Sequence, residues 1–135
     1  MTDAISYQLV IEAPARVRCV VGRLGVIEFP AGVYVYTGSA RRNLVGRIAR
    51  HQRTHKRLRW HIDYLLAAPG VCITNVVRSK RDECDLNQAT RGQVLFPGFG
   101  ASDCRKGCGA HLKYRGGGIA RAPAQGRRLG AVERG

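Results

Sequence analysis

The amino-acid sequence predicts a single α+β domain in which a small antiparallel sheet is combined with several helices. In the first forty residues, apolar and polar side chains alternate in short runs, which is the period of half-buried strands. Glycine and proline separate these runs as tight turns require. After residue 43, apolar residues recur every three or four positions, as in amphipathic helices. A length of 135 residues suits one core rather than two domains.

The predicted sheet begins with four strand-like runs. The first, residues 5–11, ends at a turn around Pro14, because proline fixes its own φ and favours an extended conformation in the residue before it. Residues 16–21 and 26–29 flank a segment with two glycines, and this spacing predicts a hairpin. Another strand follows in residues 33–37, where β-branched and aromatic residues alternate. In this order the four runs predict an antiparallel meander.

The middle of the chain is predicted to be mainly helical. A helix over residues 43–55 begins at an asparagine, a residue type that caps helix N-termini, and a short helix follows over residues 60–66. Residues 71–77 are mostly β-branched and predict a strand. A third helix over residues 82–91 and a short strand over residues 111–114 complete the expected elements.

The last part of the chain differs from the rest in composition. Residues 115–135 lack periodicity and large apolar side chains, which predicts a disordered basic tail. Such a tail adds nonspecific contacts to phosphates. We therefore divide the chain into a folded domain, residues 1–114, and a tail, residues 115–135.

The charge balance is the most unusual feature of the composition. Lys and Arg total 23 against 9 Asp and Glu, which gives a net charge of +14. Such an excess attracts polyanions, most often nucleic acid or anionic membrane, and a solvated inert surface is the alternative. No apolar run approaches the ~20 residues that span a bilayer, and the N-terminus lacks the pattern of a secretory signal. We therefore expect a cytoplasmic protein that binds nucleic acid and does not enter a membrane.

Five polar side chains are candidates for phosphodiester chemistry: Tyr7, Tyr36, Arg47, His51 and Glu83. A guanidinium matches the oxygens of a phosphate, and a Tyr hydroxyl or a His ring can move a proton to or from an attacking water. Glu83 is the best single carboxylate for holding a hard divalent ion. The structural alternatives are a solvated basic face for Arg47 and His51, and a helix-terminal role for Glu83.

These residues belong to an ordered series of motifs. Ile5-Ser6-Tyr7 and Tyr36-Thr37-Gly38 come first, and Arg47, His51 and Glu83 follow them along the chain. Further blocks lie at residues 60–66, 97–100 and 102–104. The series resembles the GIY-YIG nuclease superfamily, and most closely its small stand-alone Uri-type members, over about residues 5–114.

The resemblance implies a compact α/β domain with a small antiparallel sheet flanked by helices. In this sequence a whole hairpin is inserted between the two motif tyrosines, which makes their separation longer than in the excision-repair and homing nucleases of the family. The resemblance also implies hydrolysis of DNA phosphodiesters with a divalent ion, Mg²⁺ or Mn²⁺, held by Glu83. In that scheme Tyr7 and Tyr36 position or deprotonate the attacking water, and Arg47 steadies the phosphate. His51 would be an accessory base or a phosphate donor. An isoleucine stands where the family has its first motif glycine.

A second cluster of side chains has the chemistry of a zinc site. Cys104, Cys108 and His111 offer two thiols and an imidazole at close spacing, which suits tetrahedral Zn²⁺. Cys84 or His61 is the candidate fourth ligand of a structural zinc ion. Free thiols in a glycine-rich loop are the alternative.

Other residues of reactive types are expected to be structural. Cys19 and Cys72 occur within apolar strand patterns, where a free cysteine usually behaves as a small buried hydrophobe. Tyr34 is expected in the core. His61 and Asp63 are expected to form a buried hydrogen-bonded pair rather than to share a metal, because residues two apart on a helix do not face the same way.

The sequence therefore predicts a divalent-metal-dependent DNA endonuclease with a GIY-YIG-type site. A non-catalytic nucleic-acid-binding module on the same fold is the first rival, and a zinc-stabilised interaction domain is the second. The combination of Tyr36, Arg47 and Glu83 favours the enzyme, because a simple polyanion-binding surface has no use for an isolated acid among many cations.

Overall fold

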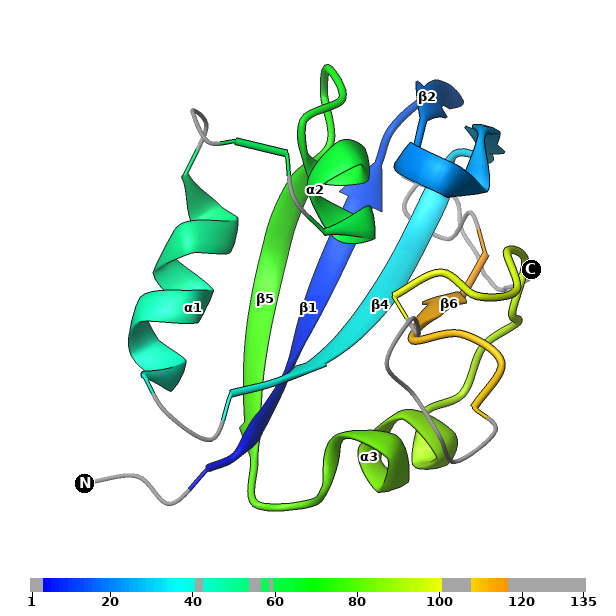
Figure 1. Cartoon of the computed structure of the whole chain (residues 1–135). Helices are drawn as coiled ribbons and strands as arrows, with labels where there is room; N and C mark the ends of the chain where they lie inside the picture. The colour runs from blue at the N-terminus through cyan, green and yellow to red at the C-terminus, as the bar shows by residue number, and fades with distance from the viewer. Residues whose placement is uncertain (1–3, 41–42, 54–56, 59, 101–107, 117–135) are drawn as a thin grey trace, which may run out of the picture.

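The computed structural model describes residues 4–40, 43–53, 57–58, 60–100 and 108–116, and within them it confirms the predicted α+β class (Figure 1). The strands are β1 Ser6–Ala13, β2 Val17–Val20, β3 Val26–Phe29, β4 Gly32–Ser39, β5 Cys72–Ser79 and β6 Leu112–Tyr114. The helices are α1 Leu44–Gln52, α2 His61–Leu66 and α3 Glu83–Ala89. A single 3₁₀ turn, η1 Gly22–Leu24, connects β2 to β3.

The main sheet has four antiparallel strands in the order β5-β1-β4-β6. β1 pairs with β4 along its whole length, from Ser6 opposite Ser39 to Ala13 opposite Gly32. The predicted meander is wrong, because β2 and β3 form a separate two-stranded sheet. β1 already has β4 on one edge and β5 on the other, so neither edge remains for β2.

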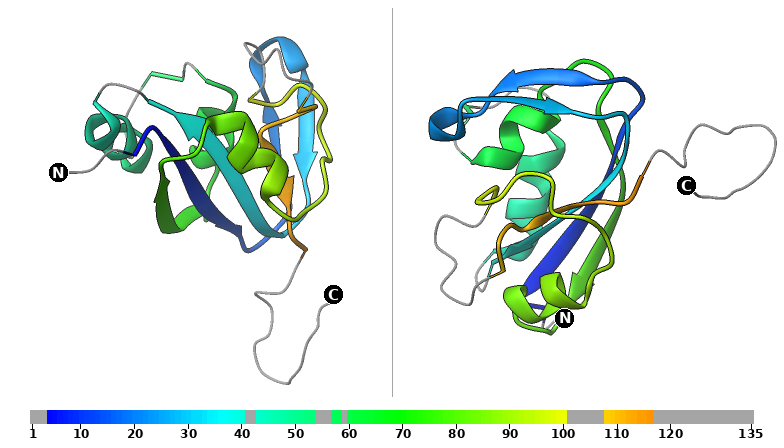
Figure 2. Two further views of the ribbon diagram at one scale, coloured as in Figure 1. Left: turned by 90° about the horizontal axis from the view of Figure 1, so that it is seen from below. Right: turned by 90° about the vertical axis from the view of Figure 1, so that its right-hand side faces the viewer.

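The core lies on one side of β1, where alternate side chains point the same way. Leu9 and Ile11 of β1 are fully buried, and α1 and α2 cover them with Ile48 and Leu65. Figure 2 (right) shows both helices on the same side of the sheet. The separate hairpin contributes Phe29, whose ring packs edge-on against three other aromatic rings, those of Tyr34, Phe96 and Phe99.

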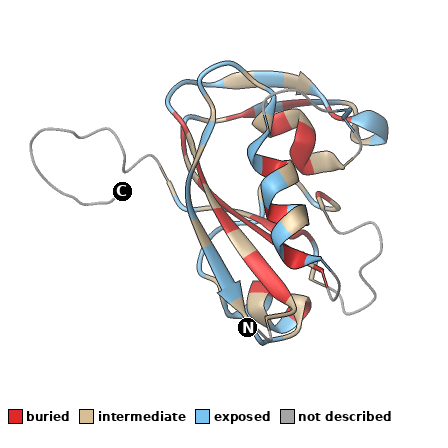
Figure 3. Cartoon of the chain, turned by 90° about the vertical axis from the view of Figure 1, so that its left-hand side faces the viewer, coloured by how far each residue is buried: buried red, intermediate tan, exposed pale blue. Residues whose placement is uncertain are grey.

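Burial differs between the centre and the edge of the main sheet. Figure 3 shows buried residues along the central strands and exposed residues along β5. Cys72 lies at the start of this edge strand and is exposed, so its predicted buried role is wrong, and Cys19 is only half-buried. Tyr34 is in the core as predicted. An edge strand of β-branched residues looks apolar in sequence, but its burial depends on whether another element covers it.

Each helix begins within one residue of its predicted start; α2 ends at Leu66 as predicted, whereas α1 and α3 end earlier than predicted. The side chain of Asn43 accepts a hydrogen bond from the backbone N–H of Gly46, which confirms it as the N-cap of α1. The helix ends at Gln52, because Arg53 is already extended. Asp82 caps α3 by accepting from the N–H of Cys84 at 3.1 Å. A capping side chain determines locally where a helix begins. Where a helix ends depends instead on how far its apolar face packs against the rest of the domain.

The backbone stays paired slightly beyond the predicted end of the domain. The N–H of Arg115 donates to the carbonyl of Val33, and the N–H of Val33 donates to the carbonyl of Gly116. These two bonds extend the contact of β6 with β4, so residues 115 and 116 belong to the folded unit. The remaining residues of the predicted tail, 117–135, lie outside the described part of the chain. The helices among the described residues include none that is long and apolar enough to cross a membrane.

Candidate active site

Two tyrosines and a histidine meet where β1, β4 and α1 come together. Tyr7 on β1 lies opposite Gly38, and Tyr36 on β4 lies opposite Leu9, so both rings project from the same side of the sheet. Their centroids are 6.4 Å apart. The hydroxyl of Tyr7 lies 2.6 Å from Nε2 of His51, which is buried on α1. The three side chains therefore form one contiguous polar cluster inside an otherwise apolar core.

Gly38 allows the ring of Tyr7 to lie directly against β4. A Cβ atom at this position would stand 2.6 Å from both Cζ and Oη of Tyr7, far inside van der Waals contact. The residue after it, Ser39, accepts a hydrogen bond from Arg47 through its carbonyl at 3.1 Å. The Tyr36-Thr37-Gly38 motif thus supplies one tyrosine and makes room for the other.

Arg47 lies at the exposed end of this cluster and stacks on a tryptophan. Its guanidinium carbon is 4.8 Å from the ring centroid of Trp60, and that of Arg50 is 4.2 Å from the same ring. The ring of His51 also lies 5.4 Å from that of Trp60. Cations over an indole face are held by its quadrupole, so Trp60 keeps the basic side chains of α1 in place.

Arg50 has a second partner that the sequence interpretation missed. It donates two hydrogen bonds of 3.0 Å to the carboxylate of Asp63, which is fully buried. Asp63 also accepts from the backbone N–H of Trp60 at 2.8 Å. The only sequence signal was its position three residues after Trp60, where a carboxylate caps a helix start. That signal predicts the start of α2 and does not reveal the pairing with α1.

His61 has its own partner rather than the predicted pairing with Asp63. Its Nδ1 accepts a hydrogen bond from the N–H of Gly100 at 2.8 Å, and its ring lies 5.5 Å from that of Phe99. Burial lowers the pKa of this imidazole. His61 therefore fastens the segment around Gly100 to α2 and is not among the groups that gather near Cys108.

Arg47 and Glu83 carry opposite charges, and both influence the pKa of Tyr7 and of Tyr36. Burial raises the pKa of Tyr7 and of Tyr36 well above the ordinary value, so both hydroxyls are protonated at neutral pH. Arg47 opposes this shift at both tyrosines, and the negative charge of Glu83 reinforces it at both. Tyr7, Tyr36 and His51 thus lie together, and the charges of Arg47 on α1 and Glu83 on α3 both influence the two tyrosines.

The raised pKa values predict a specific response to alkaline pH. Because the folded-state pKa of Tyr7 and Tyr36 lies above the unfolded value of 10, the stability they contribute is complete below pH 10 and is lost as the pH rises further. The free energy of unfolding in urea should therefore fall above pH 10. Phenolate absorbance should also develop at higher pH in the folded protein than in the unfolded one. Superimposable titration curves would contradict the burial of these hydroxyls.

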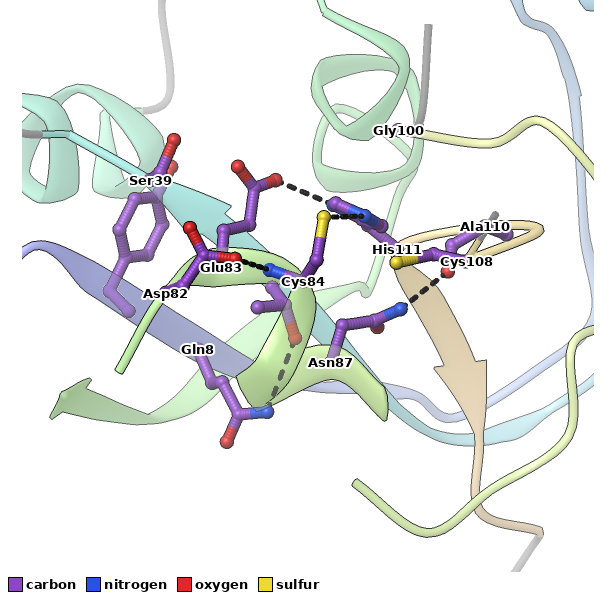
Figure 4. Close-up of polar contacts among 12 residues, drawn as sticks. Gln8, Ser39, Asp82, Glu83, Cys84, Asn87, Gly100, Cys108, Ala110 and His111 are labelled. Carbon is purple, nitrogen blue, oxygen red and sulfur yellow. Dashed lines mark hydrogen bonds and ion pairs between the residues drawn. The ribbon is translucent and has the colours of Figure 1, made fainter. Parts of the chain in front are cut away.

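Glu83 begins α3 and faces a histidine from the end of the chain. Its Oε2 lies 2.5 Å from Nδ1 of His111, which is almost fully buried, whereas the side chain of Glu83 is 25% exposed. Figure 4 shows its second carboxylate oxygen directed away from that imidazole. Glu83 therefore has one oxygen held by His111, on a side chain that is still partly exposed.

Two cysteines, Cys84 and Cys108, lie close to His111. Ligand atoms of Cys84, Cys108 and His111 all lie within 4.8 Å of one another, so the three could hold a metal ion (Figure 4). Nε2 of His111 is 3.9 Å from Sγ of Cys84. Two predicted ligands, Cys108 and His111, and one predicted alternative, Cys84, are thus brought together. Cys104 lies outside the described residues.

Comparison with known proteins assigns the chain to a family. Searches of curated proteins and of solved structures found no match. A family model described as a domain of unknown function, DUF123, matches residues 6–125. This span contains all strands and helices from β1 to β6, including both clusters of side chains around His51 and His111. The chain therefore belongs to the DUF123 family.

Proposed function

We propose that this protein is a divalent-metal-dependent endonuclease that hydrolyses DNA phosphodiester bonds with a GIY-YIG-type site. The observation that supports it is that Tyr7, Tyr36 and His51 pack together while the charges of Arg47 and Glu83 both influence the two tyrosines. These residues are dispersed over most of the domain in sequence, and a constellation of acid, base and phosphate-binding groups at one place is what hydrolysis needs.

Glu83 is the residue that would hold a hard cation. Mg²⁺ and Mn²⁺ are bound through one or two carboxylates with several waters, so a partly exposed carboxylate with one oxygen fixed by His111 fits such an ion. The ion would offset negative charge on the phosphate and on the departing oxygen. Arg47, exposed and beside the tyrosines, would bind the phosphate through its guanidinium.

The protonated tyrosines suit a relay better than a permanent phenolate. Tyr7 lies 2.6 Å from Nε2 of His51, so its hydroxyl proton can pass to the imidazole while its oxygen accepts a proton from the attacking water. Tyr36, with its ring 5.8 Å from that of His51, would orient the same water. In this scheme His51 is the accessory base and Tyr7 connects it to the water.

The charge of the chain supports a polyanionic substrate. A net charge of +14 favours long-range attraction to DNA and carries no information on base sequence. We place the enzyme in the cytoplasm, in keeping with the free thiols of Cys19, Cys72, Cys84 and Cys108. DNA is expected to bind to this protein more weakly as the salt concentration rises.

A non-catalytic nucleic-acid-binding module, stabilised by structural Zn²⁺, is the second candidate. It is favoured by the cluster of Cys84, Cys108 and His111, which has the soft ligands of a structural site. The isoleucine at position 5, in place of the first motif glycine, also favours it. This candidate predicts tight, salt-sensitive DNA binding and no cleavage.

A cleavage assay decides between the two candidates. Supercoiled plasmid and branched DNA should be cut in Mg²⁺ or Mn²⁺ and remain intact in chelator. Arg47→Ala should reduce the cleavage rate by about 100-fold, because it removes a cation aimed at developing negative charge. Arg18→Ala is the matched control, since Arg18 is an exposed arginine on the separate hairpin and its loss changes the net charge equally. Equal rates for the two variants would reject the assigned role of Arg47, and binding without any cleavage would leave the second candidate.

A further inference from the structure

His111 is the residue that joins the two clusters of the site. Its Nδ1 faces Oε2 of Glu83 at 2.5 Å, and its Nε2 faces Sγ of Cys84 at 3.9 Å (Figure 4). The backbone on both sides is also held, because its N–H donates to the carbonyl of Phe99 and its carbonyl accepts from the N–H of Thr37. The imidazole is therefore fixed in place between a carboxylate and two thiols.

The hydrogen bond to Glu83 determines which nitrogen can bind a metal. A carboxylate is an acceptor, so Nδ1 of a neutral His111 carries the proton and donates it to Glu83. The lone pair then lies on Nε2, which is the nitrogen that faces Cys84. Metal-binding histidines commonly donate their other N–H to a carboxylate, which orients the ring and raises its basicity.

The distances among the three donors suit a soft divalent ion. Bonds of ~2.3 Å to sulfur and ~2.0 Å to nitrogen place the ligands of tetrahedral Zn²⁺ about 3.5–3.8 Å apart. The pair Cys84 Sγ and His111 Nε2 is already at 3.9 Å, and all three donors lie within 4.8 Å. Asn87 of α3 donates to the carbonyl of Ala110 at 2.8 Å, which holds the segment carrying the other two ligands against the helix of Cys84.

We propose that Cys84, Cys108 and His111 bind Zn²⁺ and that this ion, through His111, holds the carboxylate of Glu83 in its working orientation. Cys84 and Glu83 are consecutive residues in the first turn of α3, so ligation of one thiolate also immobilises the start of the helix that carries the carboxylate. His111 is a positioning residue in this arrangement. The part concerning Glu83 as a catalytic group rests on the proposed nuclease function; the zinc site and its link to Glu83 do not.

Metal affinity tests the link independently of DNA cleavage. The full chain, purified without chelators, should contain about one zinc per molecule and, after exchange, should show thiolate-to-metal charge-transfer absorption with Co²⁺. Cys84→Ser and Cys108→Ser should each abolish that absorption, while Cys72→Ser, which changes an exposed cysteine on the edge strand, should retain it. Cys108→Ser lies in a loop, so circular dichroism of this variant also separates loss of ligand from loss of fold.

The carboxylate itself provides the sharper test. Glu83→Ala should weaken zinc affinity by about 10–100-fold, the effect of losing the carboxylate behind a ligating histidine. Asp85→Ala should leave it unchanged, because Asp85 is an exposed acid in the same first turn of α3. Equal zinc affinity in both variants, or less than stoichiometric zinc in the wild type, would overturn the proposal. If the wild type binds zinc with this dependence on Glu83 and cleaves no DNA, the nuclease function fails and the zinc link stands.

Discussion

Glu83→Gln is expected to reduce DNA cleavage by about 10³-fold while leaving DNA binding nearly unchanged. Glutamine has the same shape and keeps an oxygen that can accept the hydrogen bond from His111, so the fold around α3 should persist. It removes the negative charge that would hold a hard cation, and loss of preorganised electrostatic stabilisation typically costs 10²–10³ in rate, with a metal adding to this. The measurement is the single-turnover cleavage rate of plasmid DNA in Mg²⁺.

The control for this variant is Asp85→Asn, which removes one negative charge from the same helix turn at an exposed position. It should cleave at the wild-type rate. Melting temperatures of both variants show whether the helix start is intact. Cleavage that survives Glu83→Gln would remove Glu83 from the catalytic mechanism, since no charge would then be left at this position.

Asp63→Ala is expected to destabilise the protein by about 3–5 kcal/mol. Asp63 is fully buried and receives two hydrogen bonds from Arg50, whose side chain is only 17% exposed. Its removal leaves a largely buried guanidinium without its carboxylate, and it also takes the acceptor from the backbone N–H of Trp60. Breaking one side of a buried ion pair has a cost of this size. Urea unfolding followed by tryptophan fluorescence measures it.

Glu28→Ala provides the comparison, because Glu28 of β3 pairs with Arg16, the residue before β2, and both side chains are more than half exposed. An exposed pair of this kind contributes less than about 1 kcal/mol. The double variant Arg50→Met with Asp63→Leu should recover part of the stability lost in Asp63→Ala, because it removes both buried charges together. Equal losses for Asp63→Ala and Glu28→Ala would show that burial does not determine the strength of the pair.

Much of the local structure could be predicted from sequence. Alternation identified β1, and the side-chain chemistry of Asn43 predicted where α1 begins. The sequence also identified the side chains of the candidate site, since few residue types bind phosphate, move protons or ligate a metal. These features depend on periods and residue chemistry within a few positions, which are readable without knowledge of distant contacts.

The pairing of strands and side chains could be decided only by the tertiary structure. Whether β2 joined the main sheet depended on β5, some fifty residues later, which occupies the free edge of β1. In the same way, Arg50 meets Asp63 and Glu83 meets His111 through contacts between separate elements. Of the two alternative ligands Cys84 and His61, it is Cys84 that lies beside Cys108. The sequence by itself determined the chemistry available to this protein. The packing of α1 and α3 against the sheet decided which of those groups lie together, because long-range contacts leave no periodic pattern in the chain.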